Sequence, residues 1–222
     1  GNNTGIRLDG AMSVGYDSKW YINEGTNNYI EYGASGSAEI KVQQGVLQVG
    51  SQIRRATNTE EGILTFNQAQ SNSTIIIGTN ANQGGEESRG IFEISNTGSS
   101  FTQVANANII IANAIANASV SSLFIDIESS AMNIAPSSKI TFGNNNTATS
   151  QEFELYASQP LKNIEVNNTS GNNPTLFLNT VSLNMDTLTV ETGSIFNANG
   201  LDLILYGDMV IDGTFSASGN DT

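Results

Sequence analysis

The sequence contains no histidine and no cysteine among its 222 residues. Without these two residue types the chain cannot form a Ser-His-Asp or Cys-His catalytic centre, a zinc site with nitrogen and sulfur ligands, a haem or iron–sulfur site, or a disulfide. Any chemistry must therefore use carboxylates, arginine, lysine, tyrosine or a metal held by oxygen atoms.

Positive charge is also scarce. Eight Lys and Arg residues stand against 21 Asp and Glu residues, which gives a net charge of -13. Such a chain lacks the basic face that neutralises phosphates, so we exclude nucleic acid as a partner. Charged residues are only 13% of the chain, whereas Asn supplies 29 residues and Gly 22. The surface must therefore be polar without being charged.

Long hydrophobic runs are absent. No stretch approaches the roughly 18 apolar residues of a membrane helix, and residues 1–5 have neither an initiator Met nor the character of a signal peptide. We therefore expect no membrane insertion, and we interpret the chain as a mature protein or an internal piece of a longer one.

Short apolar runs recur in three classes, bounded by Gly, Asn, Ser or Thr. The order A, B, C repeats with a period of about 30 residues, and one class C run is missing near residues 68–71. This pattern predicts an all-β parallel β-helix, or β-solenoid, with about three short strands per turn and six to seven turns. Class A runs begin at Val46, Ile75, Ile109, Ile140, Leu176 and Leu201, class B runs at Tyr29, Ile63, Ile91, Phe124, Phe153, Leu188 and Met209, and class C runs at Ile40, Phe101, Met132, Ile164, Ile195 and Phe215.

The chain divides into two predicted parts. Residues 43–222 carry the β-helix repeats, and residues 1–42 form an N-terminal cap or junction and a first turn, since an open solenoid end would expose its core. Trp20 and Tyr21 fit a capping core, and stacking on a sugar ring is the alternative. Only residues 112–120 offer a helical spacing, and they lie inside a repeat.

Stacked turns place like residues over like residues. We expect apolar columns inside, Asn side-chain ladders at the corners, and Gly in left-handed corner conformations. One column should contain Ile76, Ile110 and Phe177 or their immediate neighbours, and we take Ile110 as an inward residue.

The spacing from class A to class B runs falls from 17 to 8 residues along the chain, so the connecting loops should shorten toward the C-terminus. The larger loops hold the charged groups that we assign to a candidate binding edge, because stacked loops are where repeat proteins carry recognition. These residues are Arg54, Arg55, Glu86, Glu87 and Arg89, with Glu60 and Glu61 beside the first pair.

Four motifs carry a resemblance to a known family. Residues 49–55 (VGSQIRR) with 62–66, residues 89–94 (RGIFEI), the stretch LKNIEVNNTSG at 161–171, and residues 200–215 are similar to the repeat regions of giant cell-surface proteins of Bacteroidota that the type IX system secretes. The resemblance covers about residue 45 onward. It implies export, a parallel β-helix and an adhesive or filament role, and the sorting domain that normally ends such proteins is not visible.

Three candidate sites remain open to alternatives. Asp202, Asp208 and Asp212 could supply oxygen ligands to calcium, although their spacing fits no EF-hand or glycine-rich calcium repeat, and solvated turn aspartates are the alternative. The Arg and Glu pairs of the loops could instead be catalytic groups of a polysaccharide lyase or hydrolase, or surface ion pairs. Thr187, in a triplet with Asp186 and Leu188, resembles the O-glycosylation sites of exported Bacteroidota proteins.

We therefore expect a structural, adhesive and non-catalytic β-helical stalk segment at the bacterial cell surface. Expected partners are surface polysaccharide, other surface proteins, and further domains of the same long chain, with no cofactor beyond a candidate calcium ion. The oligomeric state stays open. A carbohydrate-binding or polysaccharide-degrading β-helix module is the alternative, and a shaft like that of a phage tail spike is a third.

Overall fold

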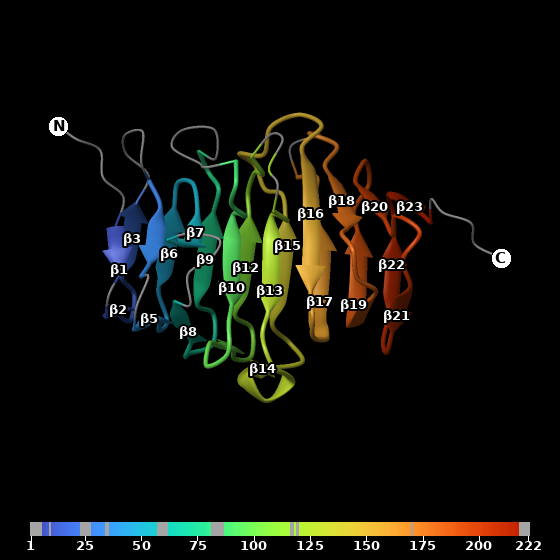
Figure 1. Ribbon diagram of the computed structural model, residues 1–222. Helices are drawn as coiled ribbons and strands as arrows, with labels where there is room; N and C mark the ends of the chain where they lie inside the picture. The colour runs from blue at the N-terminus through green and yellow to red at the C-terminus, as the bar shows by residue number, and fades with distance from the viewer. Residues whose placement is uncertain are drawn as a thin grey trace.

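The structure is a computed structural model that describes residues 6–8, 10–22, 28–33, 36–56, 62–80, 87–115, 118, 120–169 and 171–217. These residues form short parallel strands that stack side by side in chain order (Figure 1). The one helical segment among them is a single 3-10 turn, Ser129–Ala131. None of the described residues belongs to a helix long and apolar enough to cross a membrane. The predicted parallel β-helix is confirmed.

Two of the three sheets extend along the whole solenoid. Sheet 1 has nine strands, in the order β1 (Ile6–Leu8), β4 (Ile30–Tyr32), β7 (Ile53–Arg55), β10 (Phe92–Ser95), β13 (Leu123–Asp126), β16 (Glu152–Ala157), β18 (Thr175–Leu178), β20 (Ile195–Asn197) and β23 (Thr214–Ser216). Sheet 3 contains β3 (Lys19–Ile22), β6 (Val46–Val49), β9 (Thr74–Ile77), β12 (Asn108–Ile111), β15 (Lys139–Phe142), β17 (Leu161–Val166), β19 (Leu183–Val190), β21 (Leu203–Leu205) and β22 (Met209–Ile211), with β21 and β22 both paired to β19.

Sheet 2 ends midway along the solenoid. Its strands are β2 (Ala11–Val14), β5 (Ser37–Val42), β8 (Ile63–Gln68), β11 (Ser100–Gln103) and β14 (Met132–Ile134). Beyond β14 the chain passes from a sheet 1 strand directly to a sheet 3 strand, with only residues 158–160 between β16 and β17. The solenoid therefore begins with five turns of three strands each, and the later turns have two strands each. The total number of turns is larger than the six to seven predicted.

This change of cross-section shortens the repeat. Lys19, Val46, Thr74, Asn108, Lys139, Asn163 and Thr187 follow one another in register in sheet 3, so successive turns take 27, 28, 34, 31, 24 and 24 residues. The three-class prediction rests on a constant period near 30, and it therefore places most runs after β16 in the wrong sheet. Phe177 lies in sheet 1 rather than in a column with Ile76 and Ile110, and the run at 161–166 takes the sheet 3 position instead.

A second misassignment concerns the third turn. Strand β8 pairs with β5 and β11, so the class B run at Ile63 is in fact the class C strand that the sequence analysis found missing. The sheet 1 strand of this turn is β7, which was overlooked because two of its three residues are Arg54 and Arg55.

The core is a set of apolar columns inside the three sheets. Register partners in neighbouring parallel strands point to the same face of the sheet, so their apolar side chains stack on one another and fill the interior. Ile109 and Ile111 are buried, whereas Ile110 faces outward and is half-buried, so its predicted inward position is wrong. One long column in sheet 3 consists of Trp20, Leu47, Ile75, Ile109, Ile140, Ile164, Leu188 and Met209.

The N-terminal segment joins the same architecture. Strands β1, β2 and β3 pair with β4, β5 and β6, so the described residues before 43 already form a three-sheet turn. Trp20 stacks on the buried Leu47 and is 44% exposed, and Tyr21 on the outward side is 56% exposed. Trp20 thus closes the end of the column, while Tyr21 does not belong to a capping core.

Asparagine supports the corners in a different way from the predicted ladders. Asn72, Asn96, Asn106, Asn173 and Asn199 themselves adopt positive φ angles, a conformation that Asn tolerates better than most residues. Asn113 instead links three turns, because its Nδ2 donates to the carbonyls of Gly78 and Asn146 and its Oδ1 accepts from the amide of Ala148.

The connections from sheet 3 to sheet 1 vary most in length. From β9 onward they contain 14, 11, 9, 8, 4 and 2 residues, which agrees with the predicted shortening. The connection from β6 to β7 breaks the trend, since it has only three residues, 50–52. These loops border the outward face of sheet 1, where the charged and aromatic residues gather.

Candidate functional site

Charged side chains of the N-terminal turns form an ionic cluster on sheet 1, which we define as Glu31, Arg54, Arg55, Arg89 and Glu93. Glu93 lies at its centre and is fully buried. One carboxylate oxygen, Oε1, accepts from the amide of Gly90 at 2.8 Å, while Oε2 accepts from the amide and Nε of Arg55 at 3.2 and 3.4 Å. Arg89 adds an ion pair to Oε2 at 3.7 Å. Buried charges need such partners, and this carboxylate has several.

Arg54 occupies the next position of the ionic cluster. Its guanidinium donates to Gln52 Oε1 and lies 3.3 Å from a Glu31 carboxylate oxygen. It also covers the ring of Tyr29, with 3.9 Å between the guanidinium carbon and the ring centroid. Gln52 in turn donates to the carbonyl of Arg89. The ionic cluster is therefore tied together from three turns.

This arrangement changes the interpretation of the predicted binding edge. Arg54 and Arg55 lie in strand β7 rather than in a loop, and Arg54 and Arg89 are only 5% and 2% exposed. Glu87 is exposed in the turn before Arg89, and Glu86, Glu60 and Glu61 lie outside the described residues. The arginines are thus brought together, but at a place where solvent and large ligands have little access.

Tyr32 lies beside the ionic cluster and is fully buried. Its hydroxyl donates to the backbone carbonyl of Glu93 at 3.2 Å. Burial, and next the negative charge of Glu93, raise the pKa of the Tyr32 phenol well above its usual value. Tyr32 therefore stays protonated in the folded chain at alkaline pH.

Two stacked aromatic rings separate the ionic cluster from the C-terminal turns. Phe124 and Tyr156 are register partners on β13 and β16, with centroids 4.8 Å apart and planes 21° apart. Arg55 approaches the Phe124 ring at 5.7 Å. A shallow depression beside this pair is lined by Arg55, Ser95, Asn96, Asp126, Glu128 and Gln159.

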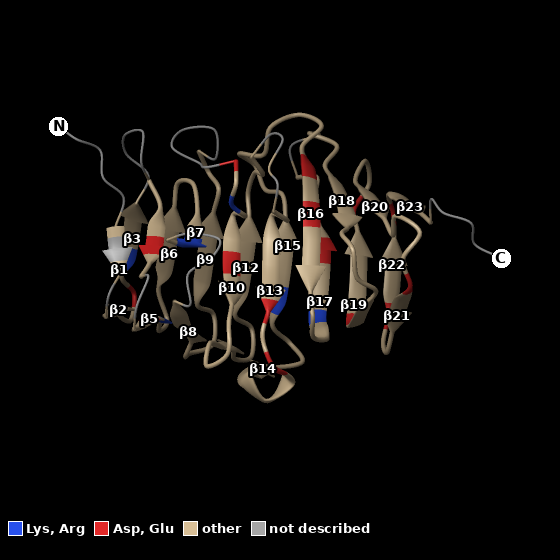
Figure 2. Cartoon of the chain, viewed as in Figure 1, with Lys and Arg blue, Asp and Glu red and all other residues tan. Residues whose placement is uncertain are grey.

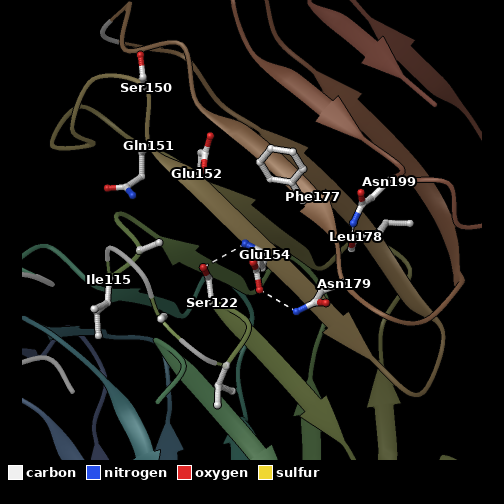
Figure 3. Close-up of a pocket in the computed structure, with 13 residues that line it drawn as sticks. Ile115, Ser122, Ser150, Gln151, Glu152, Glu154, Phe177, Leu178, Asn179 and Asn199 are labelled. Carbon is white, nitrogen blue, oxygen red and sulfur yellow. Dashed lines mark hydrogen bonds between the residues drawn. The ribbon is translucent and has the colours of Figure 1, made fainter. Parts of the chain in front are cut away.

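A larger cavity of about 500 Å³ lies farther along the same outward face, with strands β16 and β18 on one side and Ala114, Ile115, Ala118, Val120 and Ser122 on the other. We call it the sheet 1 groove (Figure 3). One wall is apolar and is made by Ala114, Ile115, Ala118 and Val120. The opposite wall carries Phe177 together with Gln151, Glu152, Glu154, Asn179 and Asn199. Its volume falls within the range of small-ligand sites.

The floor of the sheet 1 groove is ordered by hydrogen bonds. Asn179 Nδ2 donates to Glu154 Oε2 at 2.7 Å and to the hydroxyl of Ser121 at 3.0 Å. The Ser122 hydroxyl accepts from the amide of Glu154, and Asn199 donates to the carbonyl of Leu178. These contacts fix one carboxylate and two amides before any ligand arrives.

The two carboxylates share a strand face. Glu152 and Glu154 are two residues apart on β16, so their Cα atoms are about 7 Å apart and both side chains project outward. Phe177 is the register partner of Glu154 on β18. Figure 3 shows all three projecting toward the cavity. This arrangement offers hydrogen-bond acceptors beside one aromatic face.

The predicted calcium ligands are not brought together. Asp202, Asp208 and Asp212 are exposed and lie around β21 and β22. Within the described part of the chain no group of three or more Asp or Glu residues could hold a metal ion. Thr187 lies in the middle of β19 and is half-buried, beside an Asp186 that pairs with Lys162 at 3.0 Å.

The residues of the sheet 1 groove were not singled out from the sequence. Alternation of Glu152 and Glu154 with buried Phe153 and Leu155 was a usable signal, because it places two acids on one outward face. The contribution of Phe177 could not be seen, since it depends on which strand lies next to β16.

No protein-family model, curated protein or solved structure matches the chain.

Proposed function

We propose that this chain is a non-catalytic β-helical stalk segment of a large secreted bacterial surface protein, and that its exposed faces make adhesive contacts. The observation that carries the proposal is the register of sheet 3, which continues without a break from β3 to β22. Seven steps of about 4.8 Å make a stiff unit about 34 Å long. Such a unit serves well as a spacer.

The outward side of sheet 3 also supports the proposal. Its central column reads Tyr21, Gln48, Ile76, Ile110, Thr141, Glu165, Thr189 and Val210. One of these eight residues is charged, and its partner Lys139 lies 2.6 Å away. A surface with so few charged residues suits many weak contacts, whose combined affinity increases with their number.

The proposed setting is the bacterial cell surface, and the proposed partners are surface polysaccharide, other surface proteins and further domains of the same chain. Resemblance of four sequence motifs to type IX-secreted Bacteroidota proteins supports this setting. The ionic cluster supports a structural rather than catalytic role for the arginines, because their charges are paired and buried.

A carbohydrate-binding or polysaccharide-degrading module is the second candidate. The observation that favours it is the sheet 1 groove, where Glu152 and Glu154 stand on one face beside Phe177. Two carboxylates about 5 to 9.5 Å apart are the usual requirement for glycoside hydrolysis.

One experiment separates the two candidates. The purified chain is immobilised on beads and incubated with neutral and acidic bacterial surface polysaccharides, while bound polysaccharide, new reducing ends and unsaturated products are all measured. A stalk with adhesive faces retains polysaccharide without product formation. Product formation that disappears in Glu154→Gln would replace the stalk proposal by the enzymatic one, and absence of both retention and products would reject the adhesive role.

A further inference from the structure

We infer that the sheet 1 groove is a binding site for a neutral saccharide, and that this site makes the adhesive contact. The inference rests on the adhesive role proposed above and narrows it to one cavity and one class of ligand.

Shape gives the first argument. The cavity of about 500 Å³ has an apolar wall and, across from it, the half-buried ring of Phe177. A sugar ring has two apolar faces of C–H groups and a rim of hydroxyls. The face of an aromatic ring can pack against such a C–H surface, while the hydroxyls at the rim of the sugar form hydrogen bonds with the polar residues.

Hydrogen-bonding capacity gives the second argument. Glu152 and Glu154 only accept, whereas the amide of Gln151 both donates and accepts. Asn179 already donates both N–H groups to Glu154 and Ser121, so it offers its oxygen, and Asn199 donates one N–H to Leu178 and has a second. A sugar hydroxyl also donates and accepts, so it matches this mixed lining. A primary amine in its charged form only donates, and it would give the N–H groups of Gln151 no acceptor.

Charge gives the third argument. The lining contains two carboxylates and neither Lys nor Arg, and Figure 2 shows red and no blue on β16. The whole chain carries a net charge of -13. An acidic sugar such as a uronate would therefore meet repulsion with no compensating cation, and a neutral sugar is favoured.

Direction gives the last argument. The lining residues come from successive strands and turns, from Ser122 before β13, through β16 and β18, to Asn199 after β20. The Phe124 and Tyr156 rings continue the same outward face. A saccharide chain would therefore lie along the solenoid axis, across the strands.

The test uses the whole chain and a panel of neutral hexasaccharides built from glucose, mannose, galactose, xylose or N-acetylglucosamine. Binding is measured by calorimetry beside an oligogalacturonate and a chitosan hexamer, which are the anionic and cationic counterparts. At least one neutral member should bind, and the galacturonate should not. Absence of binding by all neutral members, or tighter binding of either charged hexamer, would overturn the inference.

Variants place the binding in the sheet 1 groove. Phe177→Ala should weaken the Kd about tenfold, since it removes the stacking face, and Glu154→Gln should weaken it several-fold while the Asn179 contact is retained. Tyr21→Ala and Glu39→Gln are the matched controls on sheets 3 and 2, and they should leave the Kd unchanged.

Thermal unfolding of each variant distinguishes lost binding from lost folding. If Phe177→Ala does not fold, Glu154→Gln provides the test of the site. A saccharide whose Kd is weakened by Tyr21→Ala but not by the groove variants would contradict the site.

The bead assay separates failure of this inference from failure of the adhesive role. If beads carrying Phe177→Ala or Glu154→Gln retain surface polysaccharide as well as the unchanged chain does, another face is adhesive and the site assignment is wrong. If the unchanged chain retains nothing, the adhesive role itself fails.

Discussion

Sheets 1 and 3 are built from strands of the same turns, yet their ladders differ in regularity. Sheet 3 keeps at least three register pairs between successive strands from β3 to β19, and its outward residues are mostly uncharged. Sheet 1 narrows to a single register pair, Phe92 with Ile53, between β7 and β10. The ionic cluster lies at β7 and β10, whereas the sheet 1 groove lies farther along the same sheet, at β16 and β18.

The difference has a physical cause in the connections. The longest loops all lead from sheet 3 into sheet 1, before β10, β13, β16 and β18, so the entries to these four strands are the least constrained parts of their turns. Residues there can depart from the stacked column without disturbing two neighbouring turns. Sheet 3 thus supports the solenoid by regular stacking, while the ionic cluster and the groove both lie on sheet 1.

The largest expected effect concerns the regular side. Ile109→Asp should lower the free energy of unfolding by about 4 kcal/mol or more, because it buries an unpaired charge in the long column of sheet 3. Ile110→Asp, one residue away on the outward face, should cost about 1 kcal/mol or less. Denaturant unfolding of both variants measures the contrast. Equal losses would mean that the assignment of inward and outward faces in sheet 3 is wrong.

The next effect concerns the ionic cluster on the irregular side. Glu93→Gln should destabilise the chain by about 3 kcal/mol, since it removes the buried carboxylate charge that pairs with Arg55 and Arg89. The matched control is Glu165→Gln in sheet 3, whose partner Lys139 is 41% exposed, and its cost should be about 1 kcal/mol or less. Chemical denaturation at pH 7 in low and high salt tests both. If the two losses are equal, the ionic cluster is no more important for stability than an ordinary surface ion pair.

A smaller effect concerns Tyr32 and alkaline pH. Because its folded-state pKa is raised, the folded chain holds this proton when the unfolded chain has released it. The stabilising contribution is therefore complete below the unfolded pKa of about 10 and declines above it, by up to about 1.4 kcal/mol per pH unit. Tm measured between pH 8 and 11 should fall less steeply in Tyr32→Phe than in the unchanged chain. Parallel slopes would contradict the assignment, and Tyr21→Phe, which changes an exposed ring on sheet 3, is the control.

The sequence predicted the fold well where each turn repeats the same chemistry. Ile75, Ile109 and Ile140 begin their runs at near-constant spacing, and they do lie in one column of sheet 3. The loss of sheet 2 after β14 could not be predicted, because it is decided by the three-residue connection 158–160 and not by any apolar run. A shorter turn of this kind moves most later runs to a different sheet, although the run that begins at Leu201 still falls in sheet 3.

The candidate site was less visible for a related reason. Arg54 and Arg55 looked like surface residues, since nothing local in the sequence shows that Glu31 and Glu93 from the neighbouring turns pair with them. The sheet 1 groove combines the lining residues between Ala114 and Ser122 that the structure describes with β16 and β18, and their proximity depends on the stacking order. Sequence reasoning therefore found the charged residues of sheet 1 but not the cavity.

The smallest expected effect concerns calcium, and it tests whether the C-terminal turns add a binding site to either sheet. Asp202 and Asp208 precede β21 and β22, and Asp212 follows β22, so each carboxylate belongs to a different turn position. Calcium prefers six to eight oxygen ligands, and isolated exposed carboxylates supply too few to bind it tightly. A ligand stabilises a fold only when its concentration exceeds its Kd. Addition of 1 mM calcium, compared with a chelator, should therefore shift Tm by less than about 1 °C. A larger shift that is lost in Asp208→Asn would show that these turns close around an ion, and would place a functional site beyond sheet 1.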